Sequence, residues 1–201
     1  MGYSDILNLN AVYEIGNNVF SGAWSSSTTY AANNTVIYNG VVYSSISNSN
    51  LNNTPNTSPS LWSTVTNNVN NYTLDNGQRD TIYDHGNIIN ISGIPKGNVI
   101  PVFDYFTHSG GTGFFDVNSY PISYSKIPSF TSPQYGTNYH LTDVIDFRPR
   151  RTDGLGQTGI NTFQLPSPFN NVFANYGYYL SRIDKIILYP NGQFKTCLLY
   201  T

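Results

Sequence analysis

Two short stretches of this sequence gather the side chains that metal sites and enzymes use. In the first, DNGQRDTIYDHG, the candidate oxygen and nitrogen ligands are Asp75, Asp80, Asp84 and His85. In an extended chain Asp80 and Asp84 share one face while His85 points away, and the spacing of a calcium-binding EF-hand loop is absent. We therefore predict no metal here, but an Asx turn that starts at Asp75, with Arg79 held by a carboxylate.

Two carboxylates and three arginines make up most of the second stretch, DVIDFRPRR. Paired carboxylates carry out glycoside hydrolysis, in which one of them acts as a general acid. A neighbouring arginine lowers the pKa of a carboxyl group, which suits an ion pair and disfavours a general acid. A network of structural or assembly ion pairs is therefore predicted here and in the stretch RIDK. Its members are Asp143, Asp146, Arg148, Arg150, Arg151, Arg182 and Asp184.

The remaining stretches carry no catalytic or cofactor motif. HSGGTG, at residues 108–113, lacks the Gly-Lys-Ser/Thr ending of a phosphate-binding loop, and we expect a flexible hairpin loop. The stretch FFDV that follows it is predicted to be a strand. Cys197 lies in the apolar run TCLLY and is expected to be an inert core residue. The sequence thus predicts no enzyme activity, no catalytic residue and no cofactor.

The composition favours strands and turns over helices. Among 201 residues there are 27 Asn and a single Glu, while Ser, Thr, Gly, Tyr and Val are abundant. Charged residues make up 10 %, and a net charge of −2 offers no basic excess for the phosphates of a nucleic acid. No apolar run approaches the roughly 20 residues of a membrane-spanning helix. We therefore expect a mainly β protein that binds no nucleic acid and inserts in no membrane.

Turn and linker signals divide the chain into four parts. Residues 1–21 are a lead-in whose apolar residues fit either one strand or a short helix. Residues 22–66 form a compact unit of short strands. Residues 67–71, rich in Asn, are the linker. Residues 72–201 are a larger β-rich domain.

Two hairpins are expected within these parts. TVIYNGVVYSS is the first, because Asn39-Gly40 supplies the positive φ angles of a type I′ turn. The second is RIDKIILYPNGQFKTCLLY, with Pro190-Asn191-Gly192 at its tip. Between them, VIPVFDYF is predicted to be a buried strand.

Large aromatics and turn residues recur at open spacing through the unit at 22–66. They are Trp24, Tyr30, Val36, Tyr38, Gly40, Tyr43, Pro55 or Pro59, and Trp62. This frame resembles the family 5/12 carbohydrate-binding modules, which are small β modules attached to chitinases. The resemblance implies a module whose core is a few large aromatics, because so short a chain cannot build a large core. Trp24, Tyr43 and Trp62 are the expected core residues.

The unit departs from that family after the second strand of its hairpin. Binding members usually carry exposed tryptophans there, whereas this chain reads SSISNSN. Sugar binding needs a flat exposed aromatic ring flanked by polar groups, and Ile46 does not supply one. Tyr30 and Tyr38 are the candidate glycan-binding residues, and each fits a buried position equally well. Recognition of a host polysaccharide and a purely structural role both stay open.

Four further blocks follow one another in the remainder of the chain. They are YTLDNGQRD with IYDHG, VFDYFTHSGGTGFFDVNSY, TDVIDFRPRR, and YGYYLSRIDKIILYPNGQF. Their content and order are similar to a domain of uncharacterised function in virion structural proteins of T4-like tailed phages. Members of that family are usually longer, so this chain is either a short member or a fragment.

The phage resemblance implies a structural component of the tail, baseplate or tail fibre, which acts through subunit assembly. The protein would be located in the virion after assembly in the host cytoplasm. Its expected partners are other virion proteins and copies of itself, as a trimer or a sixfold ring. The alternative function is a glycan-binding adhesin that uses the small module on a host-surface polysaccharide.

Overall fold

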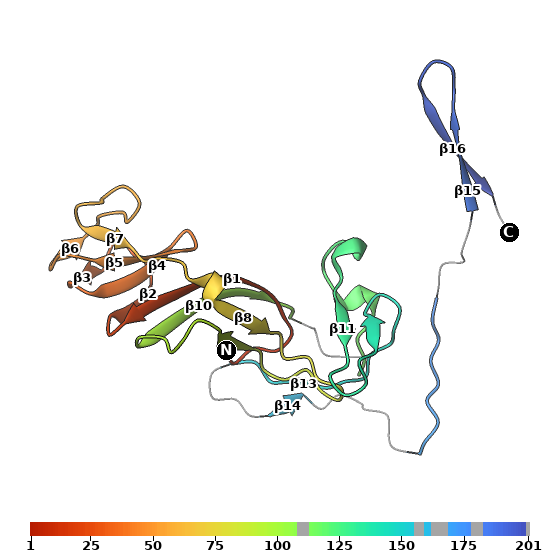
Figure 1. Cartoon of the computed structure of the whole chain (residues 1–201), viewed down its shortest axis with the longest axis horizontal. Helices are drawn as coiled ribbons and strands as arrows, with labels where there is room; N and C mark the ends of the chain where they lie inside the picture. The colour runs from red at the N-terminus through yellow and green to blue at the C-terminus, as the bar shows by residue number, and fades with distance from the viewer. Residues whose placement is uncertain (108–112, 155–158, 162–168, 178–182, 200–201) are drawn as a thin grey trace. The chain divides into compact units, whose positions relative to one another are not determined.

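The computed structural model describes residues 1–107, 113–154, 159–161, 169–177 and 183–199. The chain is mainly β, as the composition predicts, and no helix among the described residues is long and apolar enough to cross a membrane. It divides into two compact units, which we describe separately: unit 1, Met1–Leu165, and unit 2, Pro166–Thr201 (Figure 1).

The described residues of unit 1 form strands and three 3₁₀ helices. Its strands are β1 (Ile6–Gly16), β2 (Val19–Ala23), β3 (Thr29–Tyr30), β4 (Asn34–Tyr38), β5 (Val41–Ser45), β6 (Asn50–Leu51), β7 (Trp62–Thr64), β8 (Tyr72–Asp75), β9 (Asn87–Asn90), β10 (Asn98–Tyr105), β11 (Ser129–Thr131), β12 (Asn138–His140), β13 (Arg150–Arg151) and β14 (Ile160–Asn161). Its 3₁₀ helices are η1 (Val69–Asn71), η2 (Val117–Ser119) and η3 (Tyr124–Lys126).

The lead-in forms a strand, which decides between the two alternatives left by its sequence. β1 pairs antiparallel with β10 along most of its length. Residues 67–71, predicted as a linker, also lie against β1. Asn67 accepts a hydrogen bond from the Val12 N–H at 3.0 Å, and the Asn68 N–H donates to the Val12 carbonyl at 2.7 Å. β1 therefore connects the linker segment with β10.

The hairpin predicted in the small unit is confirmed together with its turn. β4 and β5 pair antiparallel across Asn39 and Gly40, whose φ angles are 50° and 76°. Asn and Gly tolerate this left-handed backbone, which a two-residue hairpin turn needs. β2 pairs parallel with β4, and β7 pairs antiparallel with β5, so the sheet order is β2-β4-β5-β7. β2 begins at Val19, ahead of the predicted start of the unit at Gly22.

Successive side chains of this sheet point to opposite faces, and each face covers its own cluster. On one face Ile37 and Val42 pack with residues of the β1–β10 ribbon; the other members are Ala11, Tyr13, Ile15, Val65, Ile100 and Val102. On the other face lies a cluster of Tyr30, Val36 and Trp62, with Trp24, Tyr43 and Leu61 packed against it. The sheet is thus fixed to the ribbon by one face and carries its aromatics on the other.

The body, residues 72–154, consists of small ribbons joined by irregular segments. The ribbons are β8–β9 and β11–β12, and β13 pairs with β14. A small apolar core holds them, made of Phe106, Tyr120, Phe130 and Leu141. Two isolated bridges, Tyr83 to Arg150 and Phe115 to Asp146, join three segments that are distant in sequence. These bridges bring the charged stretches together.

The strand predicted for FFDV is wrong. Only Phe115 forms a bridge, and the next residues turn into the 3₁₀ helix η2. Asp116 caps this helix by accepting a hydrogen bond from the Asn118 N–H, and Ser119 Oγ accepts one from the Asp116 N–H. Asp followed three residues later by Ser closes a capping box, which favours the helical turn over an extended chain.

The predictions for the run VIPVFDYF, for the glycine-rich loop and for Cys197 have different outcomes. The run VIPVFDYF does form β10, but its strand is half-buried and its end at Asp104 and Tyr105 is exposed. Residues 108–112 of the glycine-rich loop lie outside the described residues, as does the side chain of Cys197.

Unit 2 contains the second predicted hairpin, which is confirmed. β15 (Ile183–Leu188) pairs antiparallel with β16 (Phe194–Leu199). At its tip the Tyr189 N–H donates to the Gln193 carbonyl at 2.9 Å, and Gly192 has a φ of 81°. The tip therefore falls at Pro190-Asn191-Gly192, as its turn residues predict.

Candidate functional site

Three half-exposed aromatics mark the outer face of the module, a name we use for residues 22–66. Tyr38 and Tyr43 point to this face from β4 and β5, because Tyr43 pairs with Val36, two residues before Tyr38. Trp24 joins them: its ring lies 5.4 Å from that of Tyr38, edge to face, with 82° between the planes. All three residues are half-buried. They form what we call the aromatic face.

Tyr30, a candidate glycan-binding residue, lies instead in the core of the module. It is 2 % exposed, and its ring meets that of Trp62 at 5.3 Å. Its hydroxyl accepts a hydrogen bond from the Ser25 N–H at 2.8 Å. This position needs an aromatic with a polar end, because the hydroxyl satisfies a backbone donor that packing would otherwise isolate. Tyr30 therefore offers no face to a sugar.

The expected core residues also divide between core and surface. Trp62 is 3 % exposed, and its indole N–H donates to the Asn53 carbonyl at 2.9 Å. Trp24 and Tyr43, in contrast, pack against the cluster with one side only and stay half-exposed. Tyr38, the second glycan-binding candidate, is half-exposed beside them. Tyr30 thus takes the buried position, one of the two that its sequence left open, whereas Trp24 and Tyr43, expected in the core, are half-exposed.

The segment after β5 supplies no aromatic, as its sequence shows, but it is well ordered by side-chain hydrogen bonds. Ser45 Oγ donates to the Ser47 carbonyl at 2.9 Å, and Asn50 Nδ2 donates to Ser45 Oγ at 3.2 Å. Ile46 is 54 % exposed. An aliphatic side chain lacks the flat π surface against which a sugar ring packs, so this segment contributes no stacking platform.

The Asx turn predicted at the start of DNGQRDTIYDHG is confirmed. Asp75 accepts a hydrogen bond from the Gly77 N–H at 3.1 Å and forms an ion pair with Arg79 at 2.6 Å. The hydrogen bonds from Arg79 lower the pKa of Asp75 below its usual value. Gly77 is needed here, because its φ is 87° and a Cβ would lie 2.0 Å from the Asp84 carbonyl oxygen.

The other candidate metal ligands of this stretch turn to different partners. Asp80 accepts hydrogen bonds from Ser132 Oγ and the Gln134 N–H, whereas His85 Nε2 lies 2.8 Å from the Thr152 carbonyl. Within the ranges that the structure describes, no group of three His, Cys, Asp or Glu side chains is placed to hold a metal ion. The stretch is used for internal contacts of unit 1.

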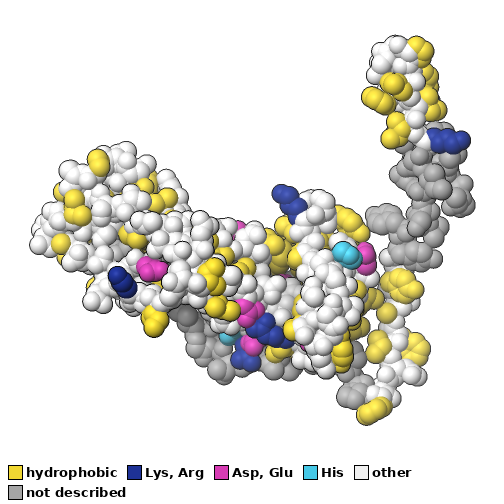
Figure 2. Space-filling model, in the orientation of Figure 1, with side chains coloured by type: hydrophobic (Ala, Val, Ile, Leu, Met, Phe, Trp, Pro, Cys, Tyr) yellow, Lys and Arg dark blue, Asp and Glu magenta, His cyan; other side chains and the backbone are white. Residues whose placement is uncertain are grey.

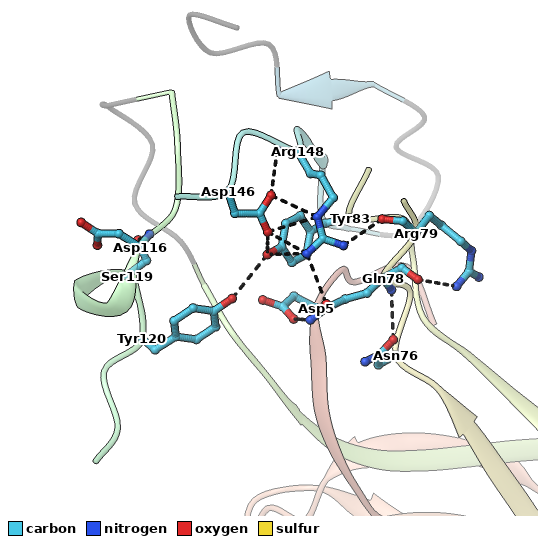
Figure 3. Close-up of polar contacts among 10 residues, drawn as sticks. All are labelled: Asp5, Asn76, Gln78, Arg79, Tyr83, Asp116, Ser119, Tyr120, Asp146 and Arg148. Atoms are coloured by element: carbon cyan, nitrogen blue, oxygen red, sulfur yellow. Dashed lines mark hydrogen bonds and ion pairs between the residues drawn. The ribbon is translucent and has the colours of Figure 1, made fainter. Parts of the chain in front are cut away.

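Asp146 and Arg148 form the centre of a nearly buried polar cluster (Figure 3). Their side chains are 9 % and 11 % exposed, and Arg148 Nη2 lies 2.7 Å from Asp146 Oδ2. The guanidinium is also sandwiched between two rings, at 4.5 Å from the Tyr83 centroid and 4.1 Å from that of Phe130. Such stacking stabilises a desolvated cation that is already paired with a carboxylate.

Two tyrosine hydroxyls complete the carboxylate side of this cluster. Tyr83 donates to Asp146 Oδ2 at 2.5 Å, and its oxygen lies 3.4 Å from the hydroxyl of Tyr120. Burial is the main reason that the pKa of each tyrosine is raised above its ordinary value, and the nearby Asp146 carboxylate adds to the effect. Figure 3 shows both hydroxyls directed toward the centre of the cluster.

On the opposite side the cluster holds the chain from Gln78 to Arg79. Arg148 donates to the Arg79 carbonyl at 2.8 Å and to Gln78 Oε1 at 3.4 Å. Gln78 Nε2 in turn donates to Asp5 at 2.9 Å. The cluster thus joins the start of β1, the Asx turn and the DVIDFRPRR stretch.

The remaining members of the predicted ion-pair network also have partners within unit 1. Arg150 pairs with Asp153 and donates to the Phe106 carbonyl at 2.7 Å. Arg151 Nε lies 2.8 Å from Asp84, close enough for an ion pair although its N–H is not aligned for a hydrogen bond.

Asp143 accepts hydrogen bonds from the hydroxyls of Tyr124 and Thr142. Arg182 lies outside the described residues, and so does the side chain of Asp184. The described pairs therefore join segments within unit 1, and a role in assembly stays a prediction.

A catalytic carboxylate pair would have to be opposed across a cleft. Five described acids each have separate partners within unit 1: Asp80, Asp84, Asp104, Asp143 and Asp146. Asp146 is closed in by Arg148 and Tyr83, and Asp104 accepts a hydrogen bond from Asn10 at 2.9 Å. Asp80, Asp84 and Asp143 each have the separate partners given above. These contacts occupy the five acids with structural partners, and activity as an enzyme is not tested by them.

Sequence reasoning missed the polar cluster's uncharged and aromatic members. They are Gln78, Tyr83, Tyr120 and Phe130. Tyr83 lies two residues before His85, in the stretch DNGQRDTIYDHG. Its aromatic side chain is the local sequence feature that could have indicated a buried position. Tyr120 and Phe130 come from other segments, so no local pattern connects them with Arg148.

The comparisons with known proteins bear on the module. Residues 23–63 match the family model described as Carbohydrate-binding module family 5/12. No curated protein and no solved structure matches the chain. The matched range contains the whole aromatic face, and it supports a carbohydrate-binding module at these residues. The phage resemblance of the body is supported by no homologue and stays a prediction.

Proposed function

We propose that the module binds a polysaccharide through its aromatic face. The observation that carries this proposal is the family match over residues 23–63. The geometry is consistent with it, since Trp24, Tyr38 and Tyr43 leave part of each ring accessible on one face of a sheet. The C–H groups of a sugar ring pack on such rings while its hydroxyls remain at the polar rim.

Polar groups flank the aromatic face without adding charge. Thr64 on β7 pairs with Tyr43 and is exposed, and Asn39 in the hairpin turn follows Tyr38 and is also exposed. Hydroxyl and amide side chains donate and accept the hydrogen bonds that sugar hydroxyls make. These neighbours suit a hydroxyl-rich ligand.

The opposite face of the sheet gives this site a rigid support. Ile37 and Val42 are packed into the cluster formed with β1 and β10, and Val42 is fully buried. Rings held on a fixed sheet lose little conformational entropy when a ligand packs on them, which favours binding. The lead-in and β10 would therefore act as the base on which the module is presented.

Retention on insoluble polysaccharides tests this function. The full chain should be retained on chitin or cellulose, and Tyr38→Ala and Tyr43→Ala should each weaken retention about tenfold, since a lost ring contact of roughly 1.4 kcal/mol has this effect. Tyr135→Ala is the matched control, because Tyr135 is 71 % exposed but lies in the body. Absence of retention on every polysaccharide tried, or equal loss in all three variants, would contradict the proposal.

A structural role in a tailed-phage virion is the second candidate, and the hairpin of unit 2 favours it. Ile186, Leu188 and Phe194 are 72 %, 61 % and 73 % exposed, and apolar side chains cover much of the hairpin's visible surface in Figure 2. An isolated two-stranded hairpin is marginally stable in water, so an apolar one gains from contact with another surface. In this proposal the protein acts by assembly in the tail, baseplate or fibre, with other virion proteins or its own copies as partners and without catalysis.

Light scattering on the full chain tests the assembly role. A trimer or a sixfold ring is expected, and Ile186→Lys together with Phe194→Lys should dissociate it, because buried lysines without partners are strongly unfavourable. Asn138→Lys, an exposed change on β12, is the control. A stable monomer for the unmodified chain at high concentration would count against this role.

A further inference from the structure

Unit 1 has a cavity outside the module, lined by residues of the lead-in and of the body. A cavity of about 340 Å³ is formed where the start of β1 passes the end of β8. Leu7, Leu74 and Pro128 provide an apolar wall, and Asp75, Asn76 and Arg79 provide polar groups. Its volume is at the lower end of the range for small-molecule sites, which fits one small ring and excludes an extended chain.

The hydrogen bonds already made around the cavity determine which groups a ligand would meet. Both oxygens of Asp75 accept hydrogen bonds from Arg79, at 2.8 and 2.6 Å. Gln78 is used at both amide atoms, by Asp5 and by Arg148. Each of these acceptors therefore already holds at least one hydrogen bond within unit 1.

Hydrogen-bond donors, in contrast, remain available at the cavity. Asn76 uses its side-chain oxygen to accept from the Gln78 N–H at 3.0 Å, and its Nδ2 makes no hydrogen bond to the described residues. Arg79 donates through Nη1 and once through Nη2, and its side chain is 37 % exposed. Its Nε–H and second Nη2–H have no acceptor among the residues that the structure describes. A ligand that brings oxygen acceptors would pair with these donors.

The charge of the lining residues further restricts the chemical class of the ligand. The residues that line the cavity include Asp5, Asp75 and Arg79, which together carry a formal charge of −1. This balance disfavours an anion. A cation would have to compete with Arg79 for Asp75, and the ion pair between them is already bidentate. The remaining class is an uncharged molecule with several oxygens and an apolar side.

We infer that this cavity binds a single uncharged sugar or polyol ring, independently of the module's aromatic face. The hydroxyl oxygens would accept from Asn76 Nδ2 and Arg79, and the C–H side would pack on Leu7, Leu74 and Pro128.

The polar cluster holds the site in place, because Arg148 donates to the Arg79 carbonyl at 2.8 Å and Asp5 accepts from Gln78. Figure 3 shows Asn76, Gln78 and Arg79 following one another beside this cluster. A fixed donor arrangement lowers the entropic cost of binding a small ligand.

Ligand-observed NMR on the full chain tests the inference, with glucose, N-acetylglucosamine and glycerol as probes. Saturation transfer to at least one ring probe is expected at about 20 mM, a concentration that populates a site of millimolar affinity. Backbone and side-chain amide shifts should change at Asn76 and Gly77. Absence of transfer from every ring probe, or binding of acetate or sulfate at these amides in place of a sugar, would overturn it.

Two conservative variants separate this site from the module. Arg79→Lys keeps a cation beside Asp75 but removes the Nε and Nη2 donors, and Asn76→Asp keeps the acceptor of the turn but removes the amide donors. Each should weaken probe binding about tenfold, the effect of one lost hydrogen bond to a charged or well-placed donor.

Lys96→Arg is the matched control, since Lys96 is exposed between β9 and β10 and is not among the residues that line the cavity, and it should leave probe binding unchanged. Tyr38→Ala should also leave it unchanged, whatever its effect on polysaccharide retention. Probe binding that is lost in Tyr38→Ala and kept in both cavity variants would place the sugar on the module and overturn the inference.

Discussion

The module and the body of unit 1 both contain short strands but are held together in different ways. From Ile15 to Leu74 the sequence contains no Asp, Glu, Lys, Arg or His. The module's core consists of Tyr30, Val36 and Trp62. The ion pairs described in unit 1, in contrast, all lie between Asp75 and Asp153. Figure 2 shows the same division on the visible surface, where charged side chains gather over the body and the module is almost free of them.

The module and the body each have a small apolar core, and each is stabilised in a different way. The module concentrates its burial in large rings, and two of them, Tyr30 and Trp62, also satisfy a backbone group through a hydroxyl or an indole N–H. The body joins irregular segments through Arg148, whose charge is matched by a carboxylate and two ring faces. The module's stability should therefore respond to volume changes, and that of the body to charge and pH.

The largest expected effect follows removal of the module's central ring. Trp62→Ala should lower the free energy of unfolding by about 4 kcal/mol, because it deletes a buried indole and leaves the Asn53 carbonyl without its donor. Chemical denaturation monitored by circular dichroism measures this change. Trp62→Phe, which keeps most of the volume, should cost less than half as much. Equal costs would mean that packing volume is not what stabilises the module.

Removing the cation from the polar cluster should be nearly as costly, but for a different reason. Arg148→Met should destabilise the body by about 3 kcal/mol, because it leaves the Asp146 carboxylate buried without its ion-pair partner. Denaturant unfolding measures the loss. The double variant Arg148→Met with Asp146→Asn should recover part of it, since no unpaired charge remains. A double variant that is less stable than Arg148→Met would contradict the comparison.

Alkaline pH should act on the body through its two buried tyrosines. The pKa of Tyr83 and of Tyr120 is raised in the folded protein, whereas unfolded tyrosine titrates near pH 10. Their contribution to stability is therefore fully present below about pH 10 and is lost as the pH rises above it. Above about pH 10, each tyrosine that stays protonated in the folded protein but ionises in the unfolded chain lowers the free energy of unfolding by about 1.4 kcal/mol per pH unit.

Denaturant unfolding at several alkaline pH values, together with tyrosinate absorbance, measures this dependence. Tyr83→Phe should reduce its slope, while Tyr135→Phe, at an exposed position, should not. If the free energy of unfolding depends on pH with the same slope in wild type and in Tyr83→Phe, burial of this hydroxyl does not contribute to the stability of the body.

The smallest effect is expected at the Asx turn, on the acidic side. Hydrogen bonds from Arg79 lower the pKa of Asp75, so its contribution to stability is present above the unfolded value near pH 4 and is lost as the pH falls below it. Because both partners are partly exposed, the contribution should be about 0.5 kcal/mol. Asp75→Asn should remove this part of the pH dependence, as measured by unfolding between neutral and acidic pH. Asp116→Asn, with its carboxylate outside any described ion pair, is the comparison variant.

Local features of the fold were predictable from the sequence to a useful degree. Asn39-Gly40 and Pro190-Asn191-Gly192 predict both hairpins at the observed positions, and Asp75 predicts its own turn with Arg79 as partner. The prediction of a strand at FFDV is wrong, because its aromatic residues favour a strand whereas Asp116 and Ser119 cap a helical turn. Within the module the sequence identified the aromatics, but it left Tyr30 open between core and surface and expected Tyr43, which is half-exposed, in the core.

The sequence by itself determined the strand-rich class, the turns and the aromatic frame, because φ preferences and side-chain hydrogen bonds act within a few residues. The tertiary structure alone decided which rings are buried and which carboxylate meets which arginine. Tyr30 is covered because β3 pairs with β6 and Trp62 packs on its ring, and Asp146 is enclosed because Tyr83 and Arg148 converge on it. Those contacts join residues far apart in the chain, so their partners are set by the packing of the whole unit and not by local spacing.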